Sequence, residues 1–222
     1  GTFMLKSSFA LIGFKAYLWV IEDIMKLDIN LEYASLILLV LIVVINILGV
    51  KRIKKVQTPI VLISTLFLFL TCILAIFTVE LNWNAVFSRD AFGSGWESVA
   101  STAAFVFVSY AGVTKIAAVG GEIKNPSNNI PKGILLSLLL CSALYVFVTL
   151  IMAASVDPSF YMEEGTLHAR EDPVYIFANE VGGYNFGILA SLLAVLTMTS
   201  MALAGIMASS RFLFAMARDS LL

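Results

Sequence analysis

The sequence predicts an all-α polytopic membrane protein with about six transmembrane helices, one of them discontinuous. Hydrophobic residues make up 60% of the 222 residues, charged residues make up 13%, and the mean hydropathy is +0.95. A soluble chain carries about a quarter charged residues. The charges are also collected in short clusters between long apolar segments. Segments of about ten residues with alternating hydrophobicity, which would indicate a β-barrel, are absent.

Six apolar segments approach or exceed the roughly 20 residues that a helix needs to cross a bilayer. These predicted spans cover residues 2–20, 34–50, 58–79, 99–121, 133–156 and 184–216. The chain opens on Gly1, already inside an apolar segment, so we expect residues 1–222 to be one truncated transmembrane domain. Aromatic residues near the ends of the spans, which we assign to the membrane–water interfaces, are Tyr17, Trp19, Trp83 and Trp96.

The links between the spans alternate in charge. The link after the second span is KRIKK at 51–55, and the link after the fourth, 122–132, contains Lys124 and Lys132. The intervening links are acidic. Lysine and arginine collect in short cytoplasmic loops. We therefore expect loops 51–55 and 122–132 to face the cytoplasm, with the protein in the cell (plasma) membrane.

The segment 105–131 combines features of a spanning helix and of a turn. It reads FVFVSYAGVTKIAAVGGEIKNPSNNIP, loosens at SYAG (109–112) and carries Lys115 in its apolar part. In lipid every backbone polar group needs a partner, so an interrupted spanning helix survives only beside protein or a watery cavity. Many secondary transporters build their substrate site from such interrupted helices. The segment therefore indicates a transporter.

The longest link, 157–172, holds the single histidine, His168. It precedes a short amphipathic stretch that starts at Pro173 and ends at the pair Gly182-Gly183. Loops of this length that have structure of their own often act as lids. A plain solvated loop is the alternative.

Four motifs resemble those of the amino acid–polyamine–organocation (APC) permeases, in the same order along the chain. They are SSFALIGFKAYL (7–18), NILGVKRIKKVQ (46–57), EIKNPSNNIPKG (122–133) and SRFLFAMARDSLL (210–222). The resemblance implies a five-plus-five inverted-repeat transporter fold, of which this chain is a part running from the third to the eighth transmembrane helix. It also implies an amino acid as the substrate and the missing helices of the same chain as packing partners, within a lipid bilayer.

The resemblance places the substrate pocket at the loosened helix. Free backbone N–H groups at a half-helix N-terminus suit the substrate carboxylate, and unwound carbonyl groups suit its ammonium. Gly112 has no β-carbon and permits a close approach, although a helix-packing contact is the alternative for this residue. By this resemblance the residues that line or flank the pocket are Val108, Ser109, Tyr110, Ala111, Gly112 and Thr114.

Two charged residues of the same segment are candidates for coupling or gating. Lys115 lies nine residues before Lys124, which is roughly 13 Å along a helix. A lysine near the bilayer centre costs on the order of 3 kcal/mol, so such residues face a cavity or a partner. Lys115 either supplies a charge for ion coupling, or its side chain snorkels to the membrane surface or pairs with a carbonyl group or a residue of a missing helix. Glu122, about two turns further on, is either a cytoplasmic gate residue or an interface carboxylate.

The sixth span contains a cluster of hydroxyl side chains that includes Thr197, Thr199 and Ser200. Thr199 and Ser200 are candidate ligands for a sodium ion, because hard cations prefer oxygen. Hydrogen bonds along or between helices are the alternative use of these groups. Some proton-coupled relatives carry a basic residue near the position of Ser64, and this chain has none there. Proton coupling, sodium coupling and exchange therefore all stay open, and we expect no cofactor and no resident metal.

We predict secondary active transport of amino acids by alternating access, coupled to a cation gradient or to exchange. The small, neutral residues of the expected pocket favour a neutral substrate. A substrate-sensing receptor or a channel on a transporter-like scaffold is the alternative. An enzyme is not expected, because the chain has no histidine–glutamate metal motif and no nucleophile elbow. The net charge of −1 argues against a nucleic-acid partner.

Overall fold

The computed structural model describes residues 2–25, 31–47, 50–87, 95–110, 123–162 and 170–218. Helices make up most of these residues and no β-strand occurs among them, which confirms the predicted all-α class. The elements are α1 (Thr2–Met25), α2 (Leu31–Ile47), α3 (Val50–Thr78), α4 (Trp83–Phe87), α5 (Gly95–Tyr110), α7 (Pro126–Ser155), the 3-10 helix η3 (Pro158–Tyr161), α8 (Pro173–Gly182) and α9 (Tyr184–Arg218).

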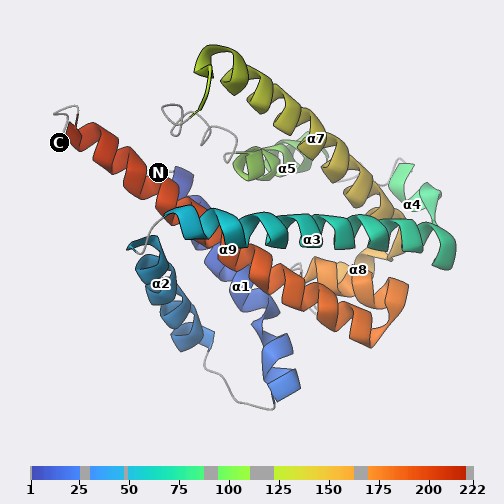
Figure 1. Ribbon diagram of the computed structural model, residues 1–222. Helices are drawn as coiled ribbons and strands as arrows, with labels where there is room; N and C mark the ends of the chain where they lie inside the picture. The colour runs from blue at the N-terminus through green and yellow to red at the C-terminus, as the bar shows by residue number, and fades with distance from the viewer. Residues whose placement is uncertain are drawn as a thin grey trace.

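Helix α9 occupies the centre of the described arrangement. It packs against α1, α2, α3 and α8, and α3 runs beside it across the molecule (Figure 1). Helix α7 packs against α3 and α4 and lies on the opposite side of α3 from α1 and α2 (Figure 1). Segments that are far apart in the sequence therefore meet along α9.

Two helices begin earlier than the apolar segments predict. Helix α3 starts at Val50 and includes the basic stretch 51–55, because lysine and arginine are good helix formers. Helix α7 starts at Pro126, where a missing N–H group costs nothing. The preceding Asn125 has a left-handed backbone with φ of 48°, a conformation that asparagine tolerates better than most residues. Both basic links thus continue into helices.

Apolar helical stretches overlap the predicted spans. Within the described residues, three stretches are long and apolar enough to cross a membrane: Gln57–Thr78, Pro126–Ser155 and Tyr184–Ile206. Shorter apolar stretches occur at Ala10–Val20 and Tyr33–Val44. The predicted span 99–121 is described as helix α5 as far as Tyr110, and residues 111–122 lie outside the described part.

Helix α8 is packed into the bundle. Its residues Ile176, Phe177 and Ala178 are buried, with Phe177 fully inaccessible. Ile176 and Phe177 join a core cluster from α3, α7 and the residue after α7, whose other buried members are Cys72, Ala75, Val148, Ile151 and Val156. The amphipathic pattern of the stretch 173–182 thus indicates a helix whose apolar side covers the core. The preceding link 157–172 is described only in part, because residues 163–169 lie outside the described residues, so its role as a lid or as a solvated loop stays a prediction.

An ion pair and two backbone hydrogen bonds fix the start of α8. Arg170 donates two hydrogen bonds to the Asp172 carboxylate, from Nε at 2.9 Å and from Nη2 at 2.7 Å. The Asp172 carbonyl oxygen accepts hydrogen bonds from the N–H groups of Tyr175 and Ile176. The chain before α8 is thereby tied to its first turn.

Close approach between α8 and α9 depends on Gly187. A β-carbon at this position would lie 2.7 Å from Tyr175 Cε2 and 3.1 Å from Asn179 Cβ. The Tyr175 ring has little freedom to move, because it makes an edge contact with Trp19 of α1 at a centroid distance of 4.9 Å. Glycine therefore permits the packing of three helices at this point.

Two polar contacts join α3 to α9. The Gln57 side chain donates to the Ser200 carbonyl oxygen at 2.8 Å. One to two turns away, the hydroxyl oxygens of Ser64 and Thr197 lie 2.8 Å apart. Thr197 Oγ1 is also 2.7 Å from the Leu193 carbonyl oxygen of its own helix. These contacts fix the register of the two long helices.

Replacing Gly187 with alanine is expected to destabilise the protein by about 1–3 kcal/mol, the usual cost of overpacking a tight contact. Thermal unfolding in detergent, followed by size-exclusion chromatography, measures the change. Gly133→Ala is the matched control, since a β-carbon at Gly133 would meet no heavy atom within 4 Å. Equal unfolding temperatures for the two variants would contradict the packing role of Gly187.

The Ser64–Thr197 contact is expected to show a coupling free energy of about 0.6 kcal/mol in a double-mutant cycle, the average for interhelical hydrogen bonds in a membrane protein. The cycle combines Ser64→Ala with Thr197→Val and measures the free energy of unfolding. A parallel cycle with Thr199→Val serves as the control, because the Thr199 hydroxyl donates to the Val195 carbonyl of its own helix. Equal coupling in the two cycles would show that no specific contact joins Ser64 to Thr197.

Candidate functional site

A cavity of about 150 Å³ lies between α1, α3, α8 and α9. Its walls are mostly apolar, and its polar groups are the hydroxyls of Tyr17, Ser64 and Thr197. The remaining lining residues are Phe67, Leu68, Val174, Ala190, Leu193, Ala194 and Met198. The cavity is thus formed where the central helix α9 meets three others.

Tyr17 connects the wall of the cavity to α8. Its side chain is 2% exposed, and its hydroxyl oxygen accepts a hydrogen bond from the Val174 N–H at 3.3 Å. Both residues line the cavity. Tyr17 is therefore a buried contact between helices and not the interfacial anchor that its position near the end of a span predicts. Its 157-residue separation from Val174 explains why the sequence pattern does not show this contact.

The lining of the cavity suits a small neutral group. None of the described residues that form it is charged. An ion in such a place would lose its hydration without gaining a counter-charge, which is strongly unfavourable. A cavity of similar size with apolar walls stays dry and takes small apolar ligands. The arrangement therefore accepts an apolar or hydroxyl-bearing group and disfavours a charged one.

The predicted cation ligands Thr199 and Ser200 lie on α9, beyond the cavity-lining Thr197 and Met198. The Thr199 hydroxyl donates to the Val195 carbonyl oxygen at 2.8 Å. Ser200 is buried, and its carbonyl oxygen accepts the hydrogen bond from Gln57. The Thr199 bond is the alternative use of a hydroxyl along its own helix, whereas the Ser200 bond involves the backbone and not the hydroxyl. The cation-binding role of both residues stays a prediction. Among the described residues, no group of three histidine, cysteine or acidic side chains is placed to hold a metal ion.

The predicted pocket residue Tyr110 lies at the end of α5 and its side chain points to α7. Its hydroxyl oxygen is 2.9 Å from Ser142 Oγ, and its ring makes an edge contact with Tyr145 at a centroid distance of 5.6 Å. Tyr110 does not line the cavity beside α9. Ser142 and Tyr145 were not among the predicted site residues, because nothing in the pattern of α7 distinguishes them from other lipid-facing or packed positions.

The other predicted residues of the segment are described only in part or not at all. Val108 and Ser109 belong to α5, but their side chains lie outside the described part of the structure. The same holds for all atoms of the predicted residues Ala111, Gly112, Thr114, Lys115 and Glu122. Ser109 and Tyr110 still belong to α5, so the helix is not interrupted at these two of the four predicted residues. At 111–112, outside the described residues, the interruption stays a prediction.

Comparison with known proteins places these features in a family. The family model described as amino acid permease matches residues 3–222 of the chain. A branched-chain amino acid permease of Bacillus subtilis is 31% identical over 172 residues, which are 77% of this chain and 35% of that protein. A methylthioribose transporter of the same organism is 34% identical over 128 residues, 58% of this chain and 26% of that protein.

A plant relative is similar to this chain at a comparable level of identity. The mitochondrial cationic amino acid transporter 3 of Arabidopsis thaliana is 34% identical over 131 residues, 59% of this chain and 20% of that protein. The matched part therefore spans about a third or less of the length of these relatives. The family match covers nearly every residue of the chain, in agreement with the four sequence motifs and the all-α structure. The chain belongs to the amino acid permease family.

Proposed function

We propose that the protein containing this chain carries out secondary active transport of amino acids by alternating access. The observation that carries the proposal is the family match along residues 3–222. The names of two of the relatives agree with it, since they describe an amino acid permease and an amino acid transporter, and the third is named as a methylthioribose transporter. Family membership also favours a transporter over an enzyme. The transport cycle needs no cofactor beyond a coupling proton or sodium ion.

The proposed substrate is a neutral amino acid. The support is the uncharged lining of the cavity between α1, α3, α8 and α9, where a cationic side chain would have no counter-charge among the described residues. The relatives differ in this respect, as one is named for branched-chain and another for cationic amino acids. By the family resemblance we expect backbone groups of the segment 108–114 to bind the carboxylate and ammonium of the substrate.

The coupling charge is assigned to Lys115. No charged group lines the cavity in the described part of the chain. Lys115 is therefore the stronger candidate for a charge that changes during transport. Glu122 is the candidate for a gate on the cytoplasmic side. The species coupled to transport through the Lys115 charge is then either a proton or an exchanged substrate.

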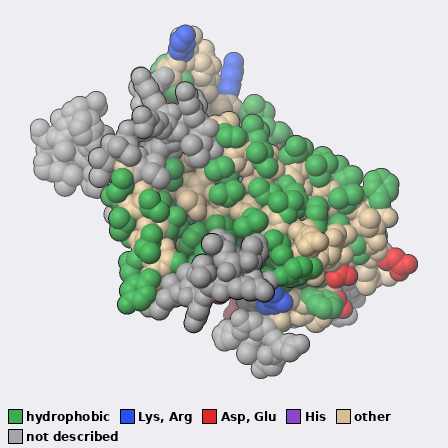
Figure 2. All heavy atoms as spheres, turned by 60° about the horizontal axis from the view of Figure 1, so that its bottom comes forward, with side chains coloured by type: hydrophobic (Ala, Val, Ile, Leu, Met, Phe, Trp, Pro, Cys, Tyr) green, Lys and Arg blue, Asp and Glu red, His purple; other side chains and the backbone are tan. Residues whose placement is uncertain are grey.

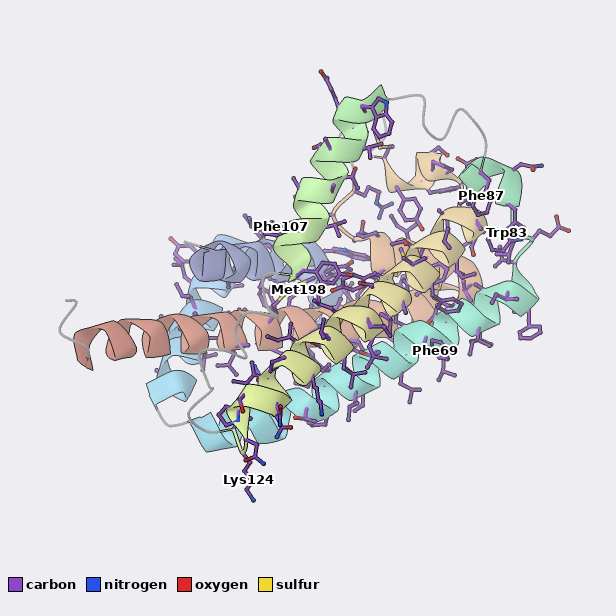
Figure 3. All side chains as sticks on the ribbon, turned by 90° about the horizontal axis from the view of Figure 1, so that it is seen from above. Phe69, Trp83, Phe87, Phe107, Lys124 and Met198 are labelled. Atoms are coloured by element: carbon purple, nitrogen blue, oxygen red, sulfur yellow. The ribbon has the colours of Figure 1, made fainter. Side chains whose placement is uncertain are left out.

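The proposed setting is the cell membrane with the basic links facing the cytoplasm. Apolar side chains cover much of the face shown in Figure 2. Basic side chains protrude at its top, acidic side chains lie at its right edge, and a further basic side chain lies at the lower edge. Lys124 points away from the bundle at the start of α7 (Figure 3). A broad apolar face with basic side chains protruding at one end supports a protein that spans a bilayer with its basic links on one side.

Counterflow in proteoliposomes tests the proposed activity. Vesicles that hold the full-length protein are loaded with unlabelled leucine and then supplied with labelled leucine, alanine or lysine. We expect transient accumulation of the labelled neutral amino acids, at least about tenfold faster than that of lysine, which corresponds to about 1.4 kcal/mol of discrimination. Protein-free vesicles are the control. A sensor would bind label without exchange, and a channel would not accumulate it.

The coupling role of Lys115 is tested by the variant Lys115→Met. We expect the initial rate of uptake to lose its dependence on pH, because the variant removes the charge assigned to coupling. Lys124→Met is the matched control, since Lys124 is exposed at the start of α7 and lies outside the proposed path. A Lys115→Met protein with the pH profile of the wild type would exclude this role.

A further inference from the structure

We propose that Ser64 of α3 is a specificity-determining residue, whose hydroxyl shifts selection among neutral substrates toward a side chain that carries a hydroxyl, such as that of threonine. The substrate that it selects against is an apolar one of the same shape, such as valine. This inference rests on the proposed function, in which the uncharged cavity between α1, α3, α8 and α9 accommodates a neutral amino acid.

Ser64 lies on the side of α3 that faces the bundle. The residues at 61–63, 65 and 66 are exposed, whereas Ser64, Phe67 and Leu68 are half-buried and line the cavity. Thr197 lines the same cavity from α9. The Ser64 hydroxyl therefore belongs to the wall of the cavity and not to the outer surface of the bundle.

The pair of hydroxyls formed by Ser64 and Thr197 has one hydrogen-bonding function to spare. Thr197 Oγ1 lies 2.7 Å from the Leu193 carbonyl oxygen and 2.8 Å from Ser64 Oγ, but a threonine hydroxyl carries a single hydrogen. If this hydrogen goes to Leu193, Ser64 donates to Thr197 and its own oxygen is left to accept. If it goes to Ser64, the hydrogen of Ser64 is left to donate. Among the described residues Thr197 is the partner of the Ser64 hydroxyl, so Ser64 can bind a ligand group in both arrangements.

Thr71 is a hydroxyl on the same helix that has no access to the cavity. Its side chain is fully buried, and it donates to the Phe67 carbonyl oxygen of α3 at 2.8 Å. Thr71 is not among the described residues that line the cavity. Ser64 and Thr71 therefore share a helix and a functional group but differ in contact with the cavity.

The size of the cavity suits the side chains that are compared. A cavity of about 150 Å³ with apolar walls holds a group as large as benzene, so the side chains of threonine and valine both fit. They have nearly the same shape, but threonine carries a hydroxyl where valine carries a methyl group. In a mostly apolar cavity a hydroxyl without a partner is unfavourable, and Ser64 supplies that partner. A methyl group at the same place leaves the spare function of Ser64 unpaired.

Counterflow of labelled threonine and labelled valine by the full-length protein tests this role. We expect Ser64→Ala to raise KM for threonine about fivefold and to keep KM for valine within about twofold, a change in threonine binding of about 1 kcal/mol at 1.4 kcal/mol per tenfold. A merely structural contact between α3 and α9 would change both KM values by the same factor. Thr71→Ala is the matched control and is expected to keep the wild-type ratio of the two KM values, because its hydroxyl bonds within α3.

An active wild type whose ratio of KM values is unchanged by Ser64→Ala would overturn this inference alone, and so would an equal rise of both values. Loss of the ratio in Tyr17→Phe but not in Ser64→Ala would also overturn it, because the Tyr17 hydroxyl would then select the substrate. If Ser64→Ala does not fold, Ser64→Cys, whose thiol is a weak hydrogen-bonding group, is measured instead with the same expected and contrary results. A wild type that exchanges leucine but not threonine overturns the inference alone. A wild type without counterflow of any of the three amino acids overturns the proposed function as well.

Discussion

Close packing of α9 against its neighbours is the interaction on which the described structure depends. Lipid tails are as apolar as leucine, so burial of apolar surface gives little drive for helices to associate within a bilayer. Small residues let helices approach closely, and the van der Waals contacts that result stabilise their association. Ala190 and Ala202 of α9 are buried, Ala10 of α1 is fully inaccessible, and Gly187 admits the Tyr175 ring. The close positions of α1 and α8 beside α9 follow from these approaches.

Polar side chains add specificity to this packing. Most described hydroxyls on the long helices bond to a carbonyl one turn earlier, as Thr71 does to Phe67 and Thr199 to Val195. These bonds remove the cost of an unsatisfied group in lipid and leave the helix free to pack in any direction. The contacts Ser64–Thr197 and Tyr110–Ser142 differ, because each needs one particular rotation and register of two helices.

The Ser64–Thr197 contact borders the cavity that supports the proposed transport. Ser64 and Thr197 belong to the wall of the cavity between α1, α3, α8 and α9, and Val174 at the start of α8 closes part of that wall. The Tyr17 hydroxyl ties α8 to α1 beside it. Phe69 of α3 and Phe147 of α7 meet at a ring-centroid distance of 5.5 Å on the other side of the bundle, where Phe69 can be followed in Figure 3. Helix α3 thus links the cavity to α7.

The sequence alone determined the all-α membrane class, the approximate spans and the family, because hydrophobic length, charge clusters and motifs such as EIKNPSNNIPKG are local properties. Only the tertiary structure decided that Tyr17 is buried, that α8 covers the core and that Ser142 meets Tyr110. In a bilayer, the face of a helix that packs on protein and the face that meets lipid are both apolar. Periodicity therefore does not say which way a spanning helix turns, and contacts across 32 to 157 residues depend on that rotation.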